Sequence, residues 1–521
     1  MFWKTDPGRR NIYLSALLSG LLLALALPPL HFGFLAWFAL VPLMIALERL
    51  QRAREGYLVG FLMGLVYFGI AMHWIGWNSG AGFGLRVASV TGAVLLLTTS
   101  FGFMMWAYAG VLKAFGRIGH FFAPLLWGGF EMMWHLGELA FPWPLVALTQ
   151  AQYLPVLQLA SIGGSALMTA VVILANAILV VGREKRRAAI IVMILALGVV
   201  LFGAMRTSLV DRTLEGQKIG RVALVQGNID AALKWKLGAD YSIDVYQPLT
   251  GSLVDQQPDL VLWPETAAPV YIQQDWKWRN RFQSFVDSLG FVLITGARYA
   301  DFTENGRIPY NPAFMVVPGA KGKFKRYSKV HLVPFGERVA FQWLIPALGK
   351  LNLGQAEFKP GDGTAVWHVE SDTDTFTVAP LICYESIFPD LGLHAVRLGA
   401  DVLLNLTNDG WYDGTAELEQ HLQLSRIRAV ETGRSLVRAT NTGISAMIMP
   451  GGRITKRLSN GVRGALVEDL QPPINTLFNR GGWIFSYVAM IAALLTTLIA
   501  VVVNVRSRRP HTTVSAGSTP A

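Results

Sequence analysis

Eight apolar stretches separated by short polar segments dominate the two ends of the chain. Seven precede residue 206 and one follows residue 481; they cover residues 12–27, 33–47, 56–77, 87–112, 121–136, 155–182, 188–205 and 483–505. A helix needs about 17–25 apolar residues to cross the roughly 30 Å hydrocarbon core of a bilayer. The pattern therefore predicts a polytopic α-helical membrane bundle of about eight spans. The second and fifth stretches are short and lie next to prolines.

Between residues 206 and 481 the apolar pattern changes from that of helices to that of strands. Runs rich in Val, Ile and Leu recur at 221–226, 259–263, 291–296, 313–317, 323–329, 376–382, 401–406 and 445–449. Most lack strict alternation, as strands buried on both faces do. Helical patterns at 276–288, 391–398 and 416–432 separate several runs, and residues 319–322 predict a hairpin. We expect one large layered α/β domain.

Composition assigns the two kinds of segment to different surroundings. The 521 residues are 52% hydrophobic and only 15% charged, against about 25% charged in an average globular domain. Part of the chain must therefore lie in lipid. The formal net charge is +11, yet residues 206–481 hold 29 Lys and Arg against 28 Asp and Glu. The basic excess belongs to the apolar segments, which argues against a nucleic-acid-binding protein.

The positions of Lys and Arg predict the orientation of the bundle, because short cytoplasmic loops are enriched in them. With both termini in the cytoplasm, Arg86 is the one basic residue outside residues 206–481 that falls on the outer side. In a bacterium the chain would then lie in the inner membrane. We expect seven transmembrane helices over 1–205, a periplasmic catalytic domain over 206–481, a last span over 482–505 and a cytoplasmic basic and polar tail over 506–521.

Three predicted strands end in a chemically reactive side chain: Glu265 in Leu-Trp-Pro-Glu-Thr, Lys329, and Cys383 in Leu-Ile-Cys-Tyr-Glu. Strand ends are where α/β sheets assemble active sites. A cysteine nucleophile needs a base or a positive field to become a thiolate. A buried carboxylate is a suitable base, and an ammonium stabilises an oxyanion. For any one of the three residues the plain alternative is an ordinary ion pair or an inert core cysteine.

The order and surroundings of these residues resemble the nitrilase superfamily of carbon–nitrogen hydrolases. The matching motifs are Trp-Pro-Glu, Lys-x-x-Leu-x-Pro-Phe-Gly-Glu from Lys329, Cys-Tyr-Glu from Cys383, and Asn-Asp-Gly-Trp from Asn408. The resemblance implies an αββα sandwich with a Glu-Lys-Cys triad. Seven apolar stretches before such a domain and one after it are similar to the membrane branch of the superfamily, the apolipoprotein N-acyltransferases.

The resemblance implies a ping-pong reaction with two membrane-bound partners. Cys383 would take a fatty acyl chain from a phospholipid, phosphatidylethanolamine in most members, as a thioester. The chain would then pass to the N-terminal α-amine of a diacylglyceryl-modified apolipoprotein, as a step in lipoprotein maturation. Glu265 would be the base, and Lys329 would stabilise the oxyanion together with a backbone N–H after Cys383. No cofactor and no metal are expected, because His331 and His421 lack metal-ligand spacing.

Further residues match family positions. Glu337 corresponds to a second glutamate that orients the lysine, although a surface carboxylate is the plain alternative. Tyr384 and Glu385 would shape the pocket or simply pack. Asn408 and Asp409 could equally be turn formers. The candidate lipid-contacting residues are Trp235, Trp411, Phe341 and Trp343, and loop tryptophans are also ordinary packing or interfacial anchors.

One apolar segment and one set of ionisable side chains have no role in the chemistry described so far. Residues 339–358 are rich in apolar side chains where the strand pattern has stopped. We interpret them as an apolar arm that enters the membrane interface, with a core-packing helix as the alternative. Glu131, His135 and Glu138 recur on one face near the outer end of the fifth stretch, where a structural or headgroup-facing role is favoured.

Two other functions fit parts of the pattern. A membrane-tethered amidase would use the same triad on a small amide, with water resolving the thioester, but one helix would suffice as its tether. A transporter or receptor would use the outer domain to bind a ligand. The apolar stretches show no paired broken helices with buried charges, which argues against a transporter.

Overall fold

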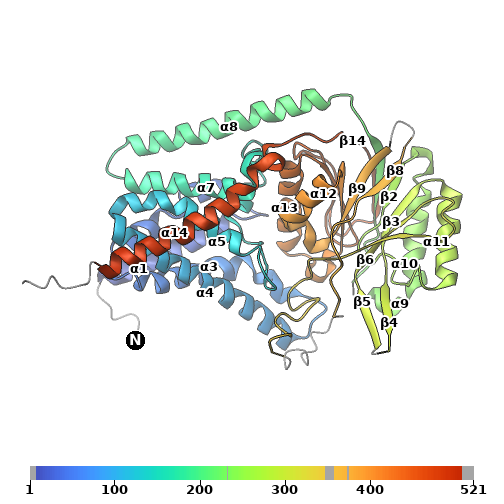
Figure 1. Cartoon of the computed structure of the whole chain (residues 1–521), viewed down its shortest axis with the longest axis horizontal. Coiled ribbons are helices and arrows are strands. Elements are labelled where there is room, and N and C mark those ends of the chain that lie inside the picture. The colour runs from blue at the N-terminus through green and yellow to red at the C-terminus, as the bar shows by residue number, and fades with distance from the viewer. Residues whose placement is uncertain (1–6, 232, 305, 346–356, 372–374, 507–521) are drawn as a thin grey trace, which may run out of the picture.

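The computed structural model describes residues 7–231, 233–304, 306–345, 357–371 and 375–506. Helices from both ends of the chain lie side by side on one side of the molecule, and the strands lie on the other (Figure 1). The bundle helices are α1 (Pro7–Leu25), α2 (Val41–Glu48), α3 (Glu55–Ala71), α4 (Phe83–Phe115), α5 (Ala123–Met133), α6 (Leu154–Leu157), α7 (Ala160–Val181), α8 (Arg187–Leu214) and α14 (Ile484–Arg506).

The bundle is less regular than eight uniform spans. Within the described residues, four apolar stretches are long enough to cross a membrane: Phe83–Met133, Ala160–Val181, Arg187–Leu214 and Phe478–Val505. The second predicted span is wrong as a single helix, because it divides into a 3₁₀ turn (Gly33–Trp37) and the eight-residue α2. The fifth is also shorter than predicted, since α5 has eleven residues. Proline near the start of both helices removes a backbone donor, which favours a helix start there over a continuous helix.

The predicted sixth span is also interrupted. The short α6 precedes α7, and Gly163 and Gly164 have non-helical backbone angles at the start of α7. Glycine tolerates the positive φ of 68° at Gly164 without steric cost. α8 extends to Leu214, and most of its apolar side chains, such as Met193 and Leu197, are exposed. An apolar helix with so little cover is typical of a lipid-facing position.

The second part of the molecule contains two six-stranded sheets and a two-stranded ribbon. The first sheet has the order β14-β1-β2-β3-β6-β7 and the second the order β13-β12-β11-β10-β9-β8, while β4 and β5 form the ribbon. The strands are β1 (Gly220–Gln226), β2 (Leu260–Leu262), β3 (Val292–Gly296), β4 (Tyr299–Thr303), β5 (Gly306–Tyr310), β6 (Pro312–Val316), β7 (Lys325–Ser328), β8 (Trp367–Glu370), β9 (Thr375–Ile382), β10 (Val402–Thr407), β11 (Ser435–Thr440), β12 (Ser445–Ile448), β13 (Ile454–Leu458) and β14 (Gly464–Leu470). β1, β2 and β3 are parallel, as are β9, β10 and β11.

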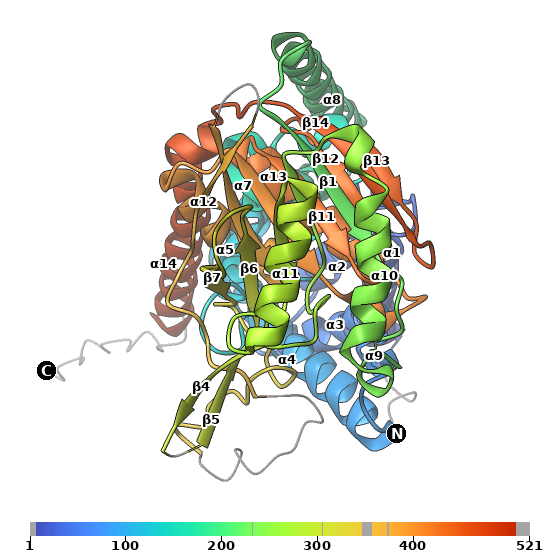
Figure 2. The ribbon, with the colours of Figure 1, turned by 90° about the vertical axis from the view of Figure 1, so that its right-hand side faces the viewer.

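The sheets pack face to face, and helices cover their outer faces. Val222 and Leu224 of β1 belong to a core shared with the second sheet, whereas Ala223 and Val225 belong to a core under the outer helices. Those helices are α9 (Leu233–Leu237), α10 (Ala239–Gly251) and α11 (Trp276–Leu289) on one face, with α12 (Pro389–Arg397) and α13 (Glu417–Thr432) on the other. Figure 2 shows α10 and α11 as the outermost layer. The result is the predicted αββα sandwich.

α13 lies between the sandwich and the bundle (Figure 1). Every residue from Glu417 to Thr432 except the half-buried Glu419 is buried. Leu418 and Leu422 pack toward the sheet, while Leu424 and Ile427 belong to the large core of the bundle. A helix covered on both faces joins the two parts of the molecule into one packed structure.

Candidate active site

The three candidate triad residues follow strands that end at the same edge of the sandwich. Glu265 follows β2 and Lys329 follows β7, both in the first sheet. Cys383 follows β9 of the facing sheet and begins the 3₁₀ helix Cys383–Ile387. The structure therefore brings the three side chains together from both sheets, although more than fifty residues separate each from the next in sequence.

Lys329 lies between two carboxylates. Its Nζ is 2.8 Å from Glu337 Oε2 and 3.7 Å from Glu265 Oε1, and its side chain is only 1% exposed. Burial on its own would lower the pKa of Lys329, but the charges of Glu337 and Glu265 more than offset it, and the pKa is raised. The ammonium therefore stays charged, and Glu337 is its nearest carboxylate partner.

The pKa values of the Cys383 thiol and the Glu265 carboxyl are both raised. Burial, and then the charge of Glu265, raise the pKa of the Cys383 thiol, while Lys329 opposes them. Burial also raises the pKa of Glu265, against the lowering effect of Lys329. The resting thiol is therefore protonated, and the adjacent carboxylate has more affinity for a proton than an ordinary glutamate. This arrangement suits general-base activation of the thiol better than a permanent thiolate.

Asn311, directly before β6, holds the two carboxylates in place. Its Nδ2 donates to Glu265 Oε1 at 2.7 Å and to Glu337 Oε1 at 3.1 Å. Its backbone carbonyl also accepts from the Lys329 N–H at 2.9 Å. Sequence reasoning missed this residue. The available signal was a polar side chain next to a buried apolar run, the same signal that pointed to Glu265.

Glu385 and Tyr384 fix the turn that carries Cys383. The fully buried Glu385 carboxylate accepts hydrogen bonds from the Tyr327 hydroxyl at 2.8 Å and from the backbone N–H groups of Ile382 and Val330, both at 2.6 Å. It thus ties the cysteine turn to the lysine turn. The Tyr384 hydroxyl donates to the Ala140 carbonyl in the bundle at 2.6 Å.

The four candidate lipid-contacting residues are dispersed around this centre. Trp411 lies against the segment that precedes α4, since its carbonyl accepts from the Ser79 N–H at 2.9 Å. Trp235 is about half exposed, with the Arg298 guanidinium 5.8 Å from its ring centroid. Trp343 is 71% exposed. The N–H of Phe341 donates to Glu138 at 2.5 Å.

The proposed apolar arm is described only at its two ends, residues 339–345 and 357–358. Residues 346–356, which include most of its length, lie outside the described residues. The expectation that Glu131, His135 and Glu138 share one helical face is wrong, because α5 ends at Met133. Glu138 instead accepts a hydrogen bond from the Phe341 N–H, at the start of the arm. Glu131 is buried and accepts from Val146 N at 2.7 Å and Thr169 Oγ1 at 2.6 Å. Its contacts are those of a structural residue.

A groove of about 610 Å³ runs along α3 and α4. Its lining is mainly apolar, with Arg86 and His73 as the basic side chains. The adjoining 3₁₀ helix His73–Trp77 contacts the turn that follows β10, where the rings of Trp74 and Tyr412 are 4.9 Å apart. The groove therefore lies close to elements that surround Cys383.

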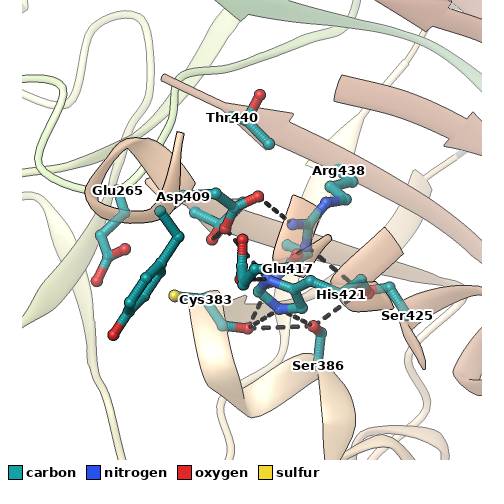
Figure 3. A network of polar contacts seen from close by, with 12 residues as sticks. Glu265, Cys383, Ser386, Asp409, Glu417, His421, Ser425, Arg438 and Thr440 are labelled. Atoms are coloured by element: carbon teal, nitrogen blue, oxygen red, sulfur yellow. Dashed lines mark hydrogen bonds and ion pairs between the residues drawn. The ribbon is translucent and has the colours of Figure 1, made fainter. Parts of the chain in front are cut away.

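Sequence reasoning also missed a second polar cluster beside Cys383 (Figure 3). A carboxylate oxygen of Asp409, a carboxylate oxygen of Glu417 and a ring nitrogen of His421 lie within 4.8 Å of one another, and all three side chains are buried. Arg438 of β11 forms a 2.6 Å ion pair with Asp409. The spacing of these residues in the sequence gives no hint of the cluster, because three separate elements contribute to it.

The sandwich and its strand-end residues define a class of protein, the carbon–nitrogen hydrolases. The family model described as "Carbon-nitrogen hydrolase" matches residues 221–474, and the model "Apolipoprotein N-acyltransferase N-terminal domain" matches residues 19–178. The chain is 32% identical to an apolipoprotein N-acyltransferase of Geobacter metallireducens, over 95% of this chain and 96% of the relative. It is also 32% identical to one of Gloeobacter violaceus, over 89% of both chains. The chain belongs to the apolipoprotein N-acyltransferase family.

The sandwich is also similar to solved structures. An amidase from Nesterenkonia sp. is 21% identical, with 51% of this chain and 94% of that chain covered and a TM-score of 0.36.

Proposed function

We propose that this enzyme moves a fatty acyl chain from a membrane phospholipid to the N-terminal α-amine of a diacylglyceryl-modified apolipoprotein, through a thioester on Cys383. One observation carries the proposal: a buried carboxylate, an ammonium and a protonated thiol meet at one sheet edge, next to the bundle. Membership of the apolipoprotein N-acyltransferase family supports the choice of donor and acceptor.

In the first half-reaction Glu265 accepts the Cys383 proton while the sulfur attacks the ester carbonyl. Lys329 and the Tyr384 N–H stabilise the negative oxygen that forms. The carbon–oxygen bond then breaks, and the lysophospholipid leaves with the proton from Glu265. In the second half-reaction the acceptor amine attacks the thioester carbonyl and Glu265 takes a proton from the nitrogen. The carbon–sulfur bond then breaks, and the leaving sulfur takes that proton from Glu265, which restores the protonated Cys383 thiol. These two steps give a ping-pong reaction.

The surroundings of the site fit a lipid donor. Exposed apolar side chains cover α8 and α14, as expected of helices in contact with lipid. The groove along α3 and α4 offers apolar walls to an acyl chain and Arg86 to a phosphate group. Phosphatidylethanolamine is the donor we expect. The excess of Lys and Arg in short loops supports an inner-membrane location with the sandwich in the periplasm.

A transfer assay with the purified protein tests this function. The protein is incubated with phosphatidylethanolamine and a short peptide that begins with diacylglyceryl-cysteine, and the products are separated by mass spectrometry. We expect lysophospholipid and N-acylated peptide in equal amounts, and neither with Cys383→Ala. Free fatty acid formed as fast without the peptide as with it would contradict the transferase and favour an amidase-like hydrolase.

A further inference from the structure

The backbone at Cys383 is held in a costly conformation. Its φ is 53°, in the left-handed region that non-glycine residues rarely adopt. Such a conformation persists only where the surroundings fix it. Three side chains contact the Cys383 carbonyl oxygen: Ser386 Oγ and Asn405 Nδ2 donate to it at 3.1 and 3.2 Å, and His421 Nε2 lies 3.3 Å from it.

This carbonyl determines where the neighbouring N–H points. In a trans peptide the C=O of one residue and the N–H of the next point in opposite directions. Figure 3 shows the Cys383 carbonyl oxygen directed at His421 and Ser386, and the sulfur on the side where Glu265 lies. Holding the carbonyl on the cluster side therefore directs the Tyr384 N–H away from the cluster.

The contacts of His421 require a proton on both ring nitrogens. Nε2 faces two oxygens, the Ser386 hydroxyl at 3.1 Å and the Cys383 carbonyl at 3.3 Å. The carbonyl can only accept, and the hydroxyl also accepts from Nε2 because its own proton is donated to the same carbonyl. Nδ1 faces two carboxylates, with Asp409 Oδ1 at 3.1 Å and Glu417 Oε1 at 3.4 Å. A lone pair on Nδ1 would be repelled by both. Since Arg438 already neutralises Asp409, the imidazolium is balanced by Glu417.

The raised pKa of His421 agrees with these contacts. Burial and Arg438 would lower the pKa of His421, but Asp409 and Glu417 outweigh them and the pKa is raised. Burial, and then the charge of Asp409, raise the pKa of Glu417 to about 7. The charged and titratable groups that face His421 are Asp409 before α13, Glu417 on α13, Arg438 on β11 and Cys383 after β9.

We propose that His421, held as an imidazolium by Asp409 and Glu417, is a positioning residue that orients the Cys383–Tyr384 peptide so that the Tyr384 N–H points at the developing oxyanion. The inference rests on the proposed function, because it assumes that Cys383 is the nucleophile. It assigns a purpose to a buried charged cluster that the triad itself does not use.

Two substitutions at His421 distinguish the contact of Nε2 with the Cys383 carbonyl from the contacts of Nδ1 with Asp409 and Glu417. In His421→Gln the terminal amide nitrogen lies near the position of Nε2 and can still donate to the Cys383 carbonyl. In His421→Asn the shorter amide lies near the position of Nδ1 and leaves the carbonyl without that donor. Two reactions of Cys383 are then compared. Iodoacetamide alkylates the thiol without forming an oxyanion, whereas p-nitrophenyl butyrate acylates it through a tetrahedral intermediate.

We expect His421→Asn to lower the rate constant for acylation by about 10- to 100-fold, because misdirecting an oxyanion donor has effects of that order. The KM for the ester and the alkylation rate should stay within about threefold of wild type. His421→Gln should restore acylation to within about fivefold. Wild-type acylation in His421→Asn, or an equal fall of acylation and alkylation in a folded variant, would overturn the proposal.

Ser386→Ala keeps the test decisive if His421→Asn does not fold. It removes a second donor to the same carbonyl, and we expect a threefold to tenfold fall in acylation with unchanged alkylation. Equal effects on both reactions would count against the anchored peptide. Phosphatidylethanolamine is tested in parallel as acyl donor. A wild-type protein acylated by the butyrate ester and not by phospholipid would contradict the proposed donor while leaving the His421 comparison valid.

Discussion

Glu265, Glu337 and Lys329 form a buried group with two potential negative charges and one positive charge. Their separations of 2.8 and 3.7 Å from Lys329 are short enough for strong coupling in a site of low polarity. The surplus carboxylate is therefore the group that most readily takes a proton. Glu265, which is farther from Lys329, is in the position of that surplus carboxylate.

The pH dependence of acylation follows from this arrangement. In the proposed mechanism Glu265 must be ionised to accept the Cys383 proton, and burial raises its pKa above the ordinary carboxyl value. Acylation should therefore rise as pH rises through that elevated pKa and be lost below it. Pre-steady-state acylation measured between about pH 4 and 9 checks this. An acid limb at the ordinary glutamate pKa, or below it, would argue against Glu265 as the base.

Asn311 provides a second test at this scale. Asn311→Leu leaves two buried carboxylates without their shared donor, and each unsatisfied buried group costs about 1–3 kcal/mol. We expect acylation to fall at least tenfold. Asn311→Asp adds a third carboxylate and should be more damaging still. Stopped-flow kinetics measure the acylation rate of both variants, and thermal unfolding measures their stability. Unchanged acylation rates would show that Asn311 has no role in the reaction.

Apolar patterning predicted the residues that end strands, and the family resemblance added Glu337, Tyr384 and Glu385, but neither predicted the role of Asn311 or the cluster around His421. Glu265, Lys329 and Cys383 stand where strands end, so their convergence followed from the topology of a layered sheet. Asn311, His421 and Arg438 act through contacts between segments far apart in the chain. Whether such polar groups are paired depends on loop geometry, which apolar periodicity does not encode.

At the scale of elements, the buried apolar strands were predictable and the polar or peripheral ones were not. All eight strands and all three helices expected in the sandwich are present. β11 was missed because the buried Arg438 interrupts its apolar pattern, and β13 because three of its five residues are exposed. In the bundle, Pro42 and Pro124 explain why α2 and α5 are shorter than their apolar stretches.

At the scale of elements, we predict that the groove along α3 and α4 binds the phospholipid donor. Val90→Trp places a large side chain in the groove, whereas Val200→Trp on the exposed surface of α8 is a matched control. We expect Val90→Trp to slow acylation by phospholipid at least tenfold and leave acylation by p-nitrophenyl butyrate unchanged. Parallel assays in detergent micelles measure both. Equal phospholipid rates in the two variants would exclude the groove as the donor site.

At the scale of the whole molecule, polar contacts as well as apolar packing join the sandwich to the bundle. Gln420 of α13 accepts from Trp143 Nε1 at 2.8 Å and donates to the Pro28 carbonyl at 3.1 Å. Arg426 donates to the Ala151 carbonyl at 3.1 Å. These bonds are buried, so removing one partner leaves an uncompensated polar group. The arrangement holds the Cys383 side of the sandwich against the bundle.

Membrane orientation is predicted at this scale by charge alone. In a Cys383→Ala background, a cysteine is introduced either at Phe302 in the exposed β4–β5 ribbon or at Glu184 between α7 and α8. A membrane-impermeant maleimide added to spheroplasts should label the first position and reach the second only after lysis. Labelling of position 184 in intact spheroplasts would reverse the orientation and place the sandwich in the cytoplasm.

The most direct measurement is the intact mass of the protein after incubation with phospholipid in the absence of an acceptor. The account predicts a fatty acyl adduct on Cys383 that hydroxylamine removes, that disappears on addition of a diacylglyceryl-cysteine peptide, and that Cys383→Ala never acquires. Acyl transfer to the peptide without any adduct at Cys383, or with the chain on another residue, would contradict it.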